Sequence, residues 1–133
     1  FDVAYPQLRQ WLAPTVAAFD LTDLWWNPAQ SGWGLNLIQH SNGQVFGVWY
    51  TYTTPNRPLW IVLPGGQWVN GSTFTGTLYT VSGPNYTQAF DPARVGSQAV
   101  GSATLTFANA NSGSFIWTVN GVSGVKVIER QPF

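Results

Sequence analysis

From Thr22 onward, short runs in which hydrophobic and polar positions alternate are separated by turn-forming residues. A repeat of two residues is typical of β-strands, because successive side chains of a strand point to opposite faces. The dipeptides Asn42-Gly43 and Asn120-Gly121 indicate tight hairpins, since they readily adopt the positive φ angles of such turns. We expect eight strands, at about 22–27, 32–40, 44–53, 58–63, 73–82, 98–107, 113–119 and 123–130.

The spacing of these runs predicts how the strands are connected. A strand about every ten residues, with short connections, pairs each strand with its sequence neighbour. We therefore expect an all-β fold, an eight-stranded antiparallel meander barrel or a barrel-like sandwich, whose interior holds side chains or one small ligand. The Pro-Gly-Gly segment 64–66 is interpreted as a turn. In the longer connection 83–97, Asp91 and Pro92 predict a single helical turn that closes one mouth of the barrel.

Residues 1–21 differ from the rest and are expected to form a short N-terminal arm, helical or irregular. Pro6 suits the first position of a helix, and Trp11 lies on the apolar face of that helix. One interpretation is a plug over one end of the barrel, packed by Trp11 and Phe19. The other is an arm that docks onto a neighbouring subunit. The chain thus divides into an arm and a β-barrel domain, 22–133.

The central runs carry apolar side chains on both faces. In the run 44–53, Tyr50 and Tyr52 share one face, whereas Val45 and Trp49 share the other. An antiparallel strand with one solvated face usually shows a polar side there. We therefore expect the second face to be covered by the arm, by a ligand or by another copy of the chain.

Aromatic residues make up 16% of the chain, including eight tryptophans. Such rings can fill a small barrel core, or a subset of them can line a surface that stacks on a ligand. Trp25, Trp26 and Trp68 are the tryptophans that we most expect to be exposed. Because Trp25 and Trp26 are adjacent on an expected strand, they must point to opposite faces, and at least one leaves the core.

The most distinctive motif reads WWNPAQSGWG and spans residues 25–34. Pro28 ends the first expected strand, because proline donates no hydrogen bond to a sheet. The polar residues Asn27, Ser31 and Asn36 have two interpretations. They satisfy turns and backbone groups, or they form a polar contact set within a tryptophan-lined pocket.

Residues 22–133 resemble a "WWNPxxSGWG" module of exported proteins of Gram-negative bacteria. Besides the motif, the resemblance rests on Pro58-Leu59-Trp60, Gly76-Thr77-Leu78-Tyr79, Phe90-Asp91-Pro92, Val119-Asn120-Gly121 and Ile128-Glu129-Arg130. It implies an exported β-domain and no particular activity. The expected meander is also similar in architecture to avidin and lipocalin barrels, a likeness of fold that does not transfer function.

Charge is scarce and balanced, with five basic and five acidic residues and 8% charged residues, against about 25% in an average soluble domain. Five dispersed basic residues are too few to neutralise a phosphate backbone, and nucleic acid is therefore not expected as a partner. No apolar run approaches the roughly 18 residues of a membrane-spanning helix, so no membrane span is expected. Abundant Thr, Ser, Asn and Gly indicate a secreted, extracellular or cell-surface protein.

Residues suited to catalysis are few. The chain has no cysteine and a single histidine, His40. A metal site usually needs three or four Cys, His or carboxylate ligands, so we expect neither a metal nor a cofactor. Asp23 and Glu129 lie on the first and last expected strands and form a conceivable carboxylate pair of the kind glycosidases use. The alternative is a salt bridge from Glu129 to Lys126 or Arg130, and we expect no enzymatic activity.

These features predict a non-catalytic extracellular binding module that takes a glycan or a small amphipathic ligand through exposed rings and Asn or Ser side chains. The candidate ligand-binding residues are Trp25, Trp26, Asn27, Trp33, Asn36, Tyr50 and Trp60. The alternative is a self-assembling structural subunit of an extracellular fibre, sheath or oligomer, which uses the N-terminal arm and the apolar outer surface. A third interpretation, a protein-binding inhibitor that probes with the arm, has no residue pattern in its favour.

Overall fold

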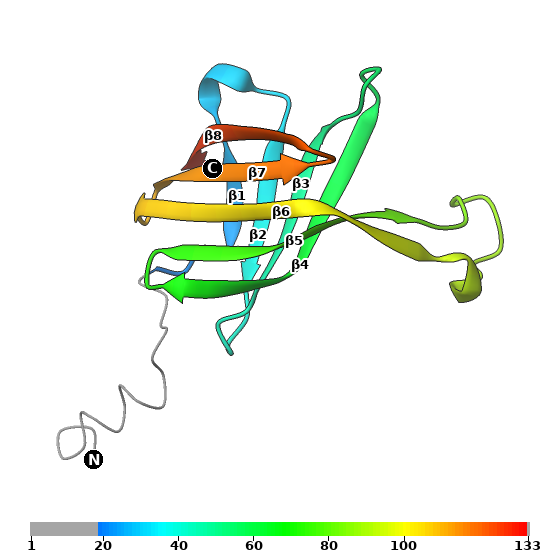
Figure 1. The fold of residues 1–133 in the computed structure, drawn as a ribbon, viewed down its shortest axis with the longest axis horizontal. Helices are drawn as coiled ribbons and strands as arrows, with labels where there is room; N and C mark the ends of the chain where they lie inside the picture. The colour runs from blue at the N-terminus through cyan, green and yellow to red at the C-terminus, as the bar shows by residue number, and fades with distance from the viewer. Residues whose placement is uncertain (1–18, 133) are drawn as a thin grey trace, which may run out of the picture.

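The computed structural model describes residues 19–132, which form a closed barrel of antiparallel strands in sequence order (Figure 1). The predicted meander barrel is confirmed. Its strands are β1 (Asp23–Trp26), β2 (Gly34–Gln39), β3 (Val45–Tyr52), β4 (Pro58–Asn70), β5 (Thr73–Ser82), β6 (Gly96–Asn109), β7 (Ser112–Val119) and β8 (Val122–Arg130). The barrel closes where β1 pairs with β8, with Trp25 opposite Arg130 and Trp26 opposite Glu129. No helix in this part of the chain is long and apolar enough to cross a lipid bilayer.

The turns follow the chemistry of their residues. Asn120 and Gly121 both have positive φ, 49° and 81°, as the tightest hairpin turn between β7 and β8 requires. Two short 3-10 helices, η1 (Pro28–Gln30) and η2 (Pro92–Arg94), each begin with proline after a side-chain cap. The cap of η2 is the Asp91 carboxylate, so the helical turn expected there is confirmed.

Strand β4 continues through Pro64 and Gly66, so the prediction of a turn at 64–66 is wrong. The pairing of β4 shifts register on both sides of this segment, which marks a bulge rather than a reversal. A Cβ atom at Gly66 would lie 2.7 Å from Leu63 Cδ2 and 3.1 Å from Phe74 Cδ2. Glycine is therefore needed here for close packing inside the barrel. The Pro-Gly-Gly sequence, which is typical of a turn, here forms a β-bulge.

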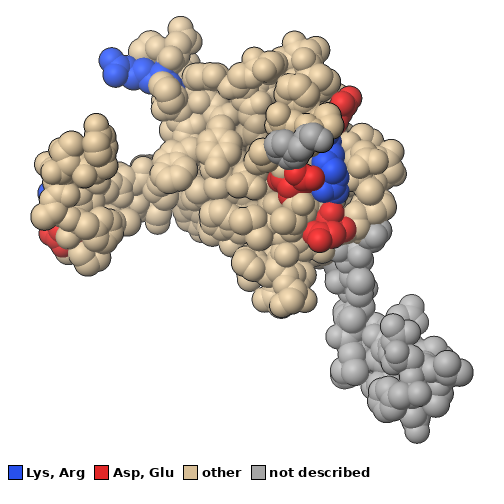
Figure 2. All heavy atoms as spheres, turned by 180° about the vertical axis from the view of Figure 1, so that it is seen from behind, with Lys and Arg blue, Asp and Glu red and all other residues tan. Residues whose placement is uncertain are grey.

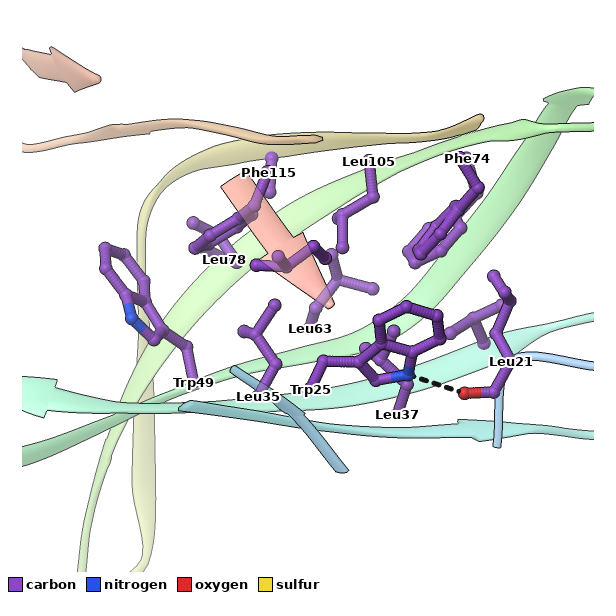
Figure 3. Close-up of a cluster of buried hydrophobic side chains, with 14 of the residues drawn as sticks. Leu21, Trp25, Leu35, Leu37, Trp49, Leu63, Phe74, Leu78, Leu105 and Phe115 are labelled. Atoms are coloured by element: carbon purple, nitrogen blue, oxygen red, sulfur yellow. Dashed lines mark hydrogen bonds between the residues drawn. The ribbon is translucent and has the colours of Figure 1, made fainter. Parts of the chain in front are cut away.

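Side chains fill the barrel interior (Figure 3). The space left among the ten residues that meet around Leu63 and Leu105 is about 10 Å³, no more than one water molecule needs. Leu21 is fully buried at one end of this cluster, and its carbonyl oxygen accepts a 2.9 Å hydrogen bond from Trp25 Nε1. Phe19 packs against the same cluster. The rest of the expected arm, Trp11 included, lies outside the described residues.

The connection between β5 and β6 does not close a mouth of the barrel, which corrects the expectation for η2. The pairing of β5 with β4 ends at Tyr79, and the pairing of β6 with β7 ends at Gly101. Beyond these two residues, β5 and β6 continue together as a two-stranded ribbon that projects away from the barrel and carries η2 near its tip (Figure 1). Because β5 and β6 extend beyond the ends of β4 and β7, the helical turn η2 lies in solvent, away from the barrel.

One ion pair joins the first and last strands. Arg130 Nη1 lies 3.1 Å from Asp23 Oδ2, and the same guanidinium donates to the carbonyl oxygens of Asp20 and Ala110. Glu129 is exposed and one residue out of phase with Arg130, so it points to the other side of β8. Asp23 and Glu129 therefore do not form a carboxylate pair. Charged side chains are few on the face drawn in Figure 2.

Candidate functional site

Two exposed rings lie side by side on the outer face of the barrel. Tyr50 on β3 is directly opposite Gly34 on β2 and Trp60 on β4. Directly opposed side chains have Cβ atoms about 5 Å apart, close enough for their rings to act together. Tyr50 is 45% exposed and Trp60 is 54% exposed. Since Gly34 has no side chain, nothing on β2 covers the flank of the Tyr50 ring in this row.

These rings belong to a hollow of about 380 Å³, which we call the aromatic groove. It is lined by Gly32, Tyr50, Thr51, Tyr52, Pro58, Leu59 and Trp60. The third ring, Tyr52, is 53% exposed, and its hydroxyl donates a 2.6 Å hydrogen bond to the carbonyl oxygen of Gly32. No lining residue is charged, so the groove is suited to a neutral ligand. Its volume lies within the range of about 300–1,000 Å³ that is common for small-molecule sites.

The loop between β1 and β2 positions one wall of the groove. The Asn27 side chain caps η1 by accepting from Ala29 N at 2.9 Å, and its amide nitrogen donates to the Val127 carbonyl oxygen at 3.2 Å. The amide oxygen thus fixes the turn within the loop, and the amide nitrogen holds the loop against β8. The loop then delivers Gly32 to Tyr52. Asn27 acts on the site by positioning it.

The structure brings together two of the predicted ligand-binding residues, Tyr50 and Trp60. Trp26 and Asn36 lie half-buried on the same outer face, outside the groove lining. The expectation that Trp25 is exposed is wrong, because its ring is 1% exposed and packs edge-on against Phe107 at 5.0 Å. Trp25 and Trp26 do point to opposite faces, as their adjacency required.

Two other tryptophans singled out in the sequence are half-buried and hydrogen-bonded. Trp33 is half-buried, and its Nε1 donates to Gln30 Oε1 at 3.0 Å. Trp68 is half-buried rather than exposed, and its Nε1 donates to the Gly43 carbonyl oxygen at 2.7 Å. Trp68 borders a separate hollow of about 310 Å³ beside the β2–β3 turn. In that hollow the Trp68 N–H is already hydrogen-bonded, and no second aromatic ring lines it. It is therefore a weaker candidate for a ligand-binding site than the aromatic groove.

Sequence reasoning did not single out Tyr52 and Gly32 as site residues. The signal for Tyr52 was present, because it follows Tyr50 by two residues and therefore shares its face. Gly32 carried no such signal. It reaches the groove only because the capped loop after β1 folds over toward β3.

The described residues offer little for acid–base or metal chemistry. Within 19–132, no three His, Asp or Glu side chains come together as metal ligands would. His40 is exposed at the end of β2. The Leu24 backbone N–H and the Arg130 guanidinium both bond the Asp23 carboxylate and hold its pKa below the usual value. Asp23 therefore belongs to the ion pair that closes the barrel and is far from the aromatic groove in the strand register.

Comparison of the chain with protein-family models, with curated proteins and with solved structures finds no match in any of the three.

Proposed function

We propose that this chain is a non-catalytic extracellular binding module and that the aromatic groove binds a neutral glycan. The observation that carries the proposal is the gathering of Tyr50, Tyr52 and Trp60, each about half exposed, in one hollow. Each Å² of apolar surface that stays in water loses roughly 25 cal/mol of the stabilisation that burial would give. Three exposed rings in one place therefore favour a binding role. Flat rings suit the apolar faces of sugar rings, and the groove has no charge to select an ion.

The extracellular assignment rests on the scarcity of charge and on the resemblance of residues 22–133 to the exported "WWNPxxSGWG" module. It stays a prediction. Fractionation of cells that express the natural protein, with detection of the protein in the medium or on the cell surface, tests it. Retention in the cytoplasm would contradict it.

The glycan proposal is tested by titrating the purified chain with a panel of neutral oligosaccharides and measuring heat and tryptophan fluorescence. We expect binding in the micromolar to millimolar range and a loss of at least about tenfold in Trp60→Ala and Tyr50→Ala, which remove stacking rings. Tyr86→Ala is the matched control, because Tyr86 is a fully exposed ring on the β5–β6 ribbon. No binding by any glycan at millimolar concentration, or an equal loss in Tyr86→Ala, would overturn the proposal.

A second candidate function, assembly with further copies of the chain, is favoured by the β5–β6 ribbon. Its strands have no outer neighbour beyond Tyr79 and Gly101, so two open strand edges face solvent. An isolated two-stranded ribbon is marginally stable in water, and a further strand would stabilise it. The ribbon also exposes Tyr86, Phe90 and Val95. A second copy could supply the strand and cover these side chains.

Assembly is tested by sedimentation of the full chain and of a variant in which residues 80–98 are replaced by Asn-Gly. Tyr79 and Ala99 are directly paired, so this replacement leaves a two-residue hairpin, removes the open strand edges and keeps the barrel. We expect the full chain to form oligomers at high concentration and the shortened chain to stay monomeric. A chain lacking residues 1–18 separates the ribbon from the N-terminal arm. A full chain that stays monomeric at millimolar concentration would contradict this candidate.

A further inference from the structure

The two ends of the barrel differ. At one end, Leu21 and Phe74 are fully buried (Figure 3). At the other end, between the β3–β4 and β7–β8 turns, lies a hollow of about 460 Å³ that we call the mouth cavity. Its lining includes Trp49, Thr51, Leu59, Trp117, Val119 and Lys126. It shares Thr51, Tyr52 and Leu59 with the lining of the aromatic groove, whereas Tyr50 and Trp60 line the groove alone.

Two indole rings form an apolar wall of the mouth cavity. The centroids of Trp49 and Trp117 lie 5.4 Å apart, with the rings inclined by 47°. Trp49 also meets Phe115 edge-on at 4.8 Å. The ring of Trp117 covers Gly124, where a Cβ atom would come within 2.5 Å of it. Both rings are thus held in place by neighbours on β7 and β8.

Both indoles have a hydrogen-bond donor without a partner. The Nε1 atoms of Trp49 and Trp117 are buried, and neither finds an acceptor among the described residues. Folded proteins rarely leave buried donors unpaired, because each one has lost its hydrogen bond to water. Away from the mouth, the Nε1 atom of Trp26 is likewise buried without a partner, whereas those of Trp25 and Trp68 are bonded to carbonyl oxygens. Both donors are covered by their neighbours, so a ligand oxygen reaches them only if the mouth rings move, and the unpaired donors favour such a movement.

One positive charge lies in this otherwise neutral cavity. Lys126 is directly opposite Phe115 in the β7–β8 pairing, so its side chain leaves β8 on the interior side. It is half-buried, and its ammonium lies 4.7 Å from the centroid of the Trp33 ring. No carboxylate of residues 19–132 forms a salt bridge with it. The cation–π contact holds the ammonium at the cavity, where an anion would complete the pair.

We propose that the mouth cavity binds a small amphipathic carboxylate, independently of the aromatic groove. The apolar part of the ligand lies against Trp49, Trp117 and Leu59, and its carboxylate pairs with Lys126. The cavity volume lies within the range of small-molecule sites, and barrel mouths are common places for them. The filled interior stops the ligand from passing deeper, so it is held at the rim, within reach of the ammonium.

The test compares decanoate with decanol, which share an alkyl chain and differ in charge, by calorimetry on the full chain. We expect decanoate to bind at least about tenfold more tightly, and Lys126→Met to remove that preference while decanol binding stays the same. Arg94→Met is the matched control, because Arg94 lies in η2 on the ribbon, and we expect it to bind both ligands as the unmodified chain does. Equal affinity for the two ligands, or an unchanged preference in Lys126→Met, would overturn the proposal.

A second readout follows the indole N–H resonances by NMR. Decanoate should shift the Nε1–H signals of Trp49 and Trp117 and leave those of Trp25, Trp26 and Trp68 in place, since these three rings do not line the mouth cavity. Shifts confined to Trp25 and Trp68 would place the ligand elsewhere. Trp60→Ala should leave decanoate binding unchanged, and Lys126→Met should leave glycan binding unchanged. Loss of decanoate binding in Trp60→Ala would move the ligand to the aromatic groove and refute a separate mouth site.

Discussion

The hydroxyl of Tyr52 donates a 2.6 Å hydrogen bond to the carbonyl oxygen of Gly32, which ties strand β3 to the loop of the tryptophan-rich motif. Gly32 has a φ of 134°, a backbone conformation that side-chain-bearing residues rarely adopt. The motif therefore contributes to the aromatic groove mainly through its backbone. The bond fixes the direction of a ring that forms one wall of the groove.

Replacing Tyr52 with Phe keeps the ring and removes this hydrogen bond. We expect a loss of about 0.5–1.5 kcal/mol in the free energy of unfolding, the usual value of one such bond. Glycan binding should weaken several-fold, because the ring and the loop are no longer held together. Urea denaturation and calorimetric titration measure the two effects. Tyr86→Phe, on a fully exposed ring, should change neither quantity, and a Tyr52→Phe variant that binds as the unmodified chain does would contradict the role given to the bond.

Stability should fall in acid because of Asp23. Its carboxylate accepts hydrogen bonds from Leu24 N and Arg130 Nη1, which lower its pKa in the folded state. A group whose folded pKa lies below its unfolded pKa stabilises the fold above about pH 4. That stabilisation is lost as the pH falls through the folded value.

The measurement is a set of urea denaturations between about pH 7 and pH 2, on the unmodified chain and on Asp23→Asn. We expect the difference in stability between the two proteins to shrink toward low pH. A double-mutant cycle with Arg130→Met isolates the ion pair, and its coupling energy should vanish once Asp23 is protonated. A difference that stays constant across the whole range would show that the pair does not contribute in this way.

Phe74 should be among the most sensitive core positions. Its ring is fully buried between Trp68, at 5.2 Å, and Phe107, at 6.0 Å. Phe74→Ala leaves a large cavity and should cost about 3–5 kcal/mol, a large part of the typical stability of a domain. The matched substitution Phe90→Ala removes an exposed ring from the ribbon and should change the stability by less than about 0.5 kcal/mol. Denaturation midpoints that fall equally in both variants would contradict this assignment of the core.

Gly101 should not tolerate alanine. A Cβ atom there would overlap the carbonyl oxygen of Thr118, on the neighbouring strand β7. The backbones of β6 and β7 would have to separate, so we expect Gly101→Ala to destabilise the barrel by at least about 1–3 kcal/mol. At Gly83 on the ribbon the nearest side-chain atom is 3.6 Å away, so Gly83→Ala should have little effect. Thermal unfolding followed by circular dichroism compares them, and a stable Gly101→Ala chain would mean that β6 and β7 are not packed this closely.

Local chemistry was enough to predict most of the strands and turns. Alternation with a period of two fixes which residues of a strand share a face, and Asn120-Gly121 adopts the two positive φ angles that its hairpin needs. Asp91 and Pro92 likewise specify a capped helical turn wherever that turn is placed. These features depend on neighbours along the chain, so the sequence alone carries them.

The candidate site was predictable only in part. The high aromatic content and the alternation of side chains along the strands point to Tyr50 and Trp60. Their direct opposition, however, depends on the register between β3 and β4. Trp25 was misplaced because alternation tells that Trp25 and Trp26 face opposite ways without telling which of them faces inward. That choice is made when β1 pairs with β8 and Trp25 lies against Phe107.

By itself, the sequence of this protein determined an antiparallel meander of eight strands, its hairpin turns and the faces that its side chains share. The tertiary structure decided that β4 bulges at 64–66 instead of turning, that β5 and β6 leave the barrel as a ribbon, and that one end is filled while the other keeps a cavity around Lys126. The physical reason is distance along the chain. Strand periodicity and turn preference act over a few residues, whereas register, closure and close packing depend on residues that meet only after the barrel has formed.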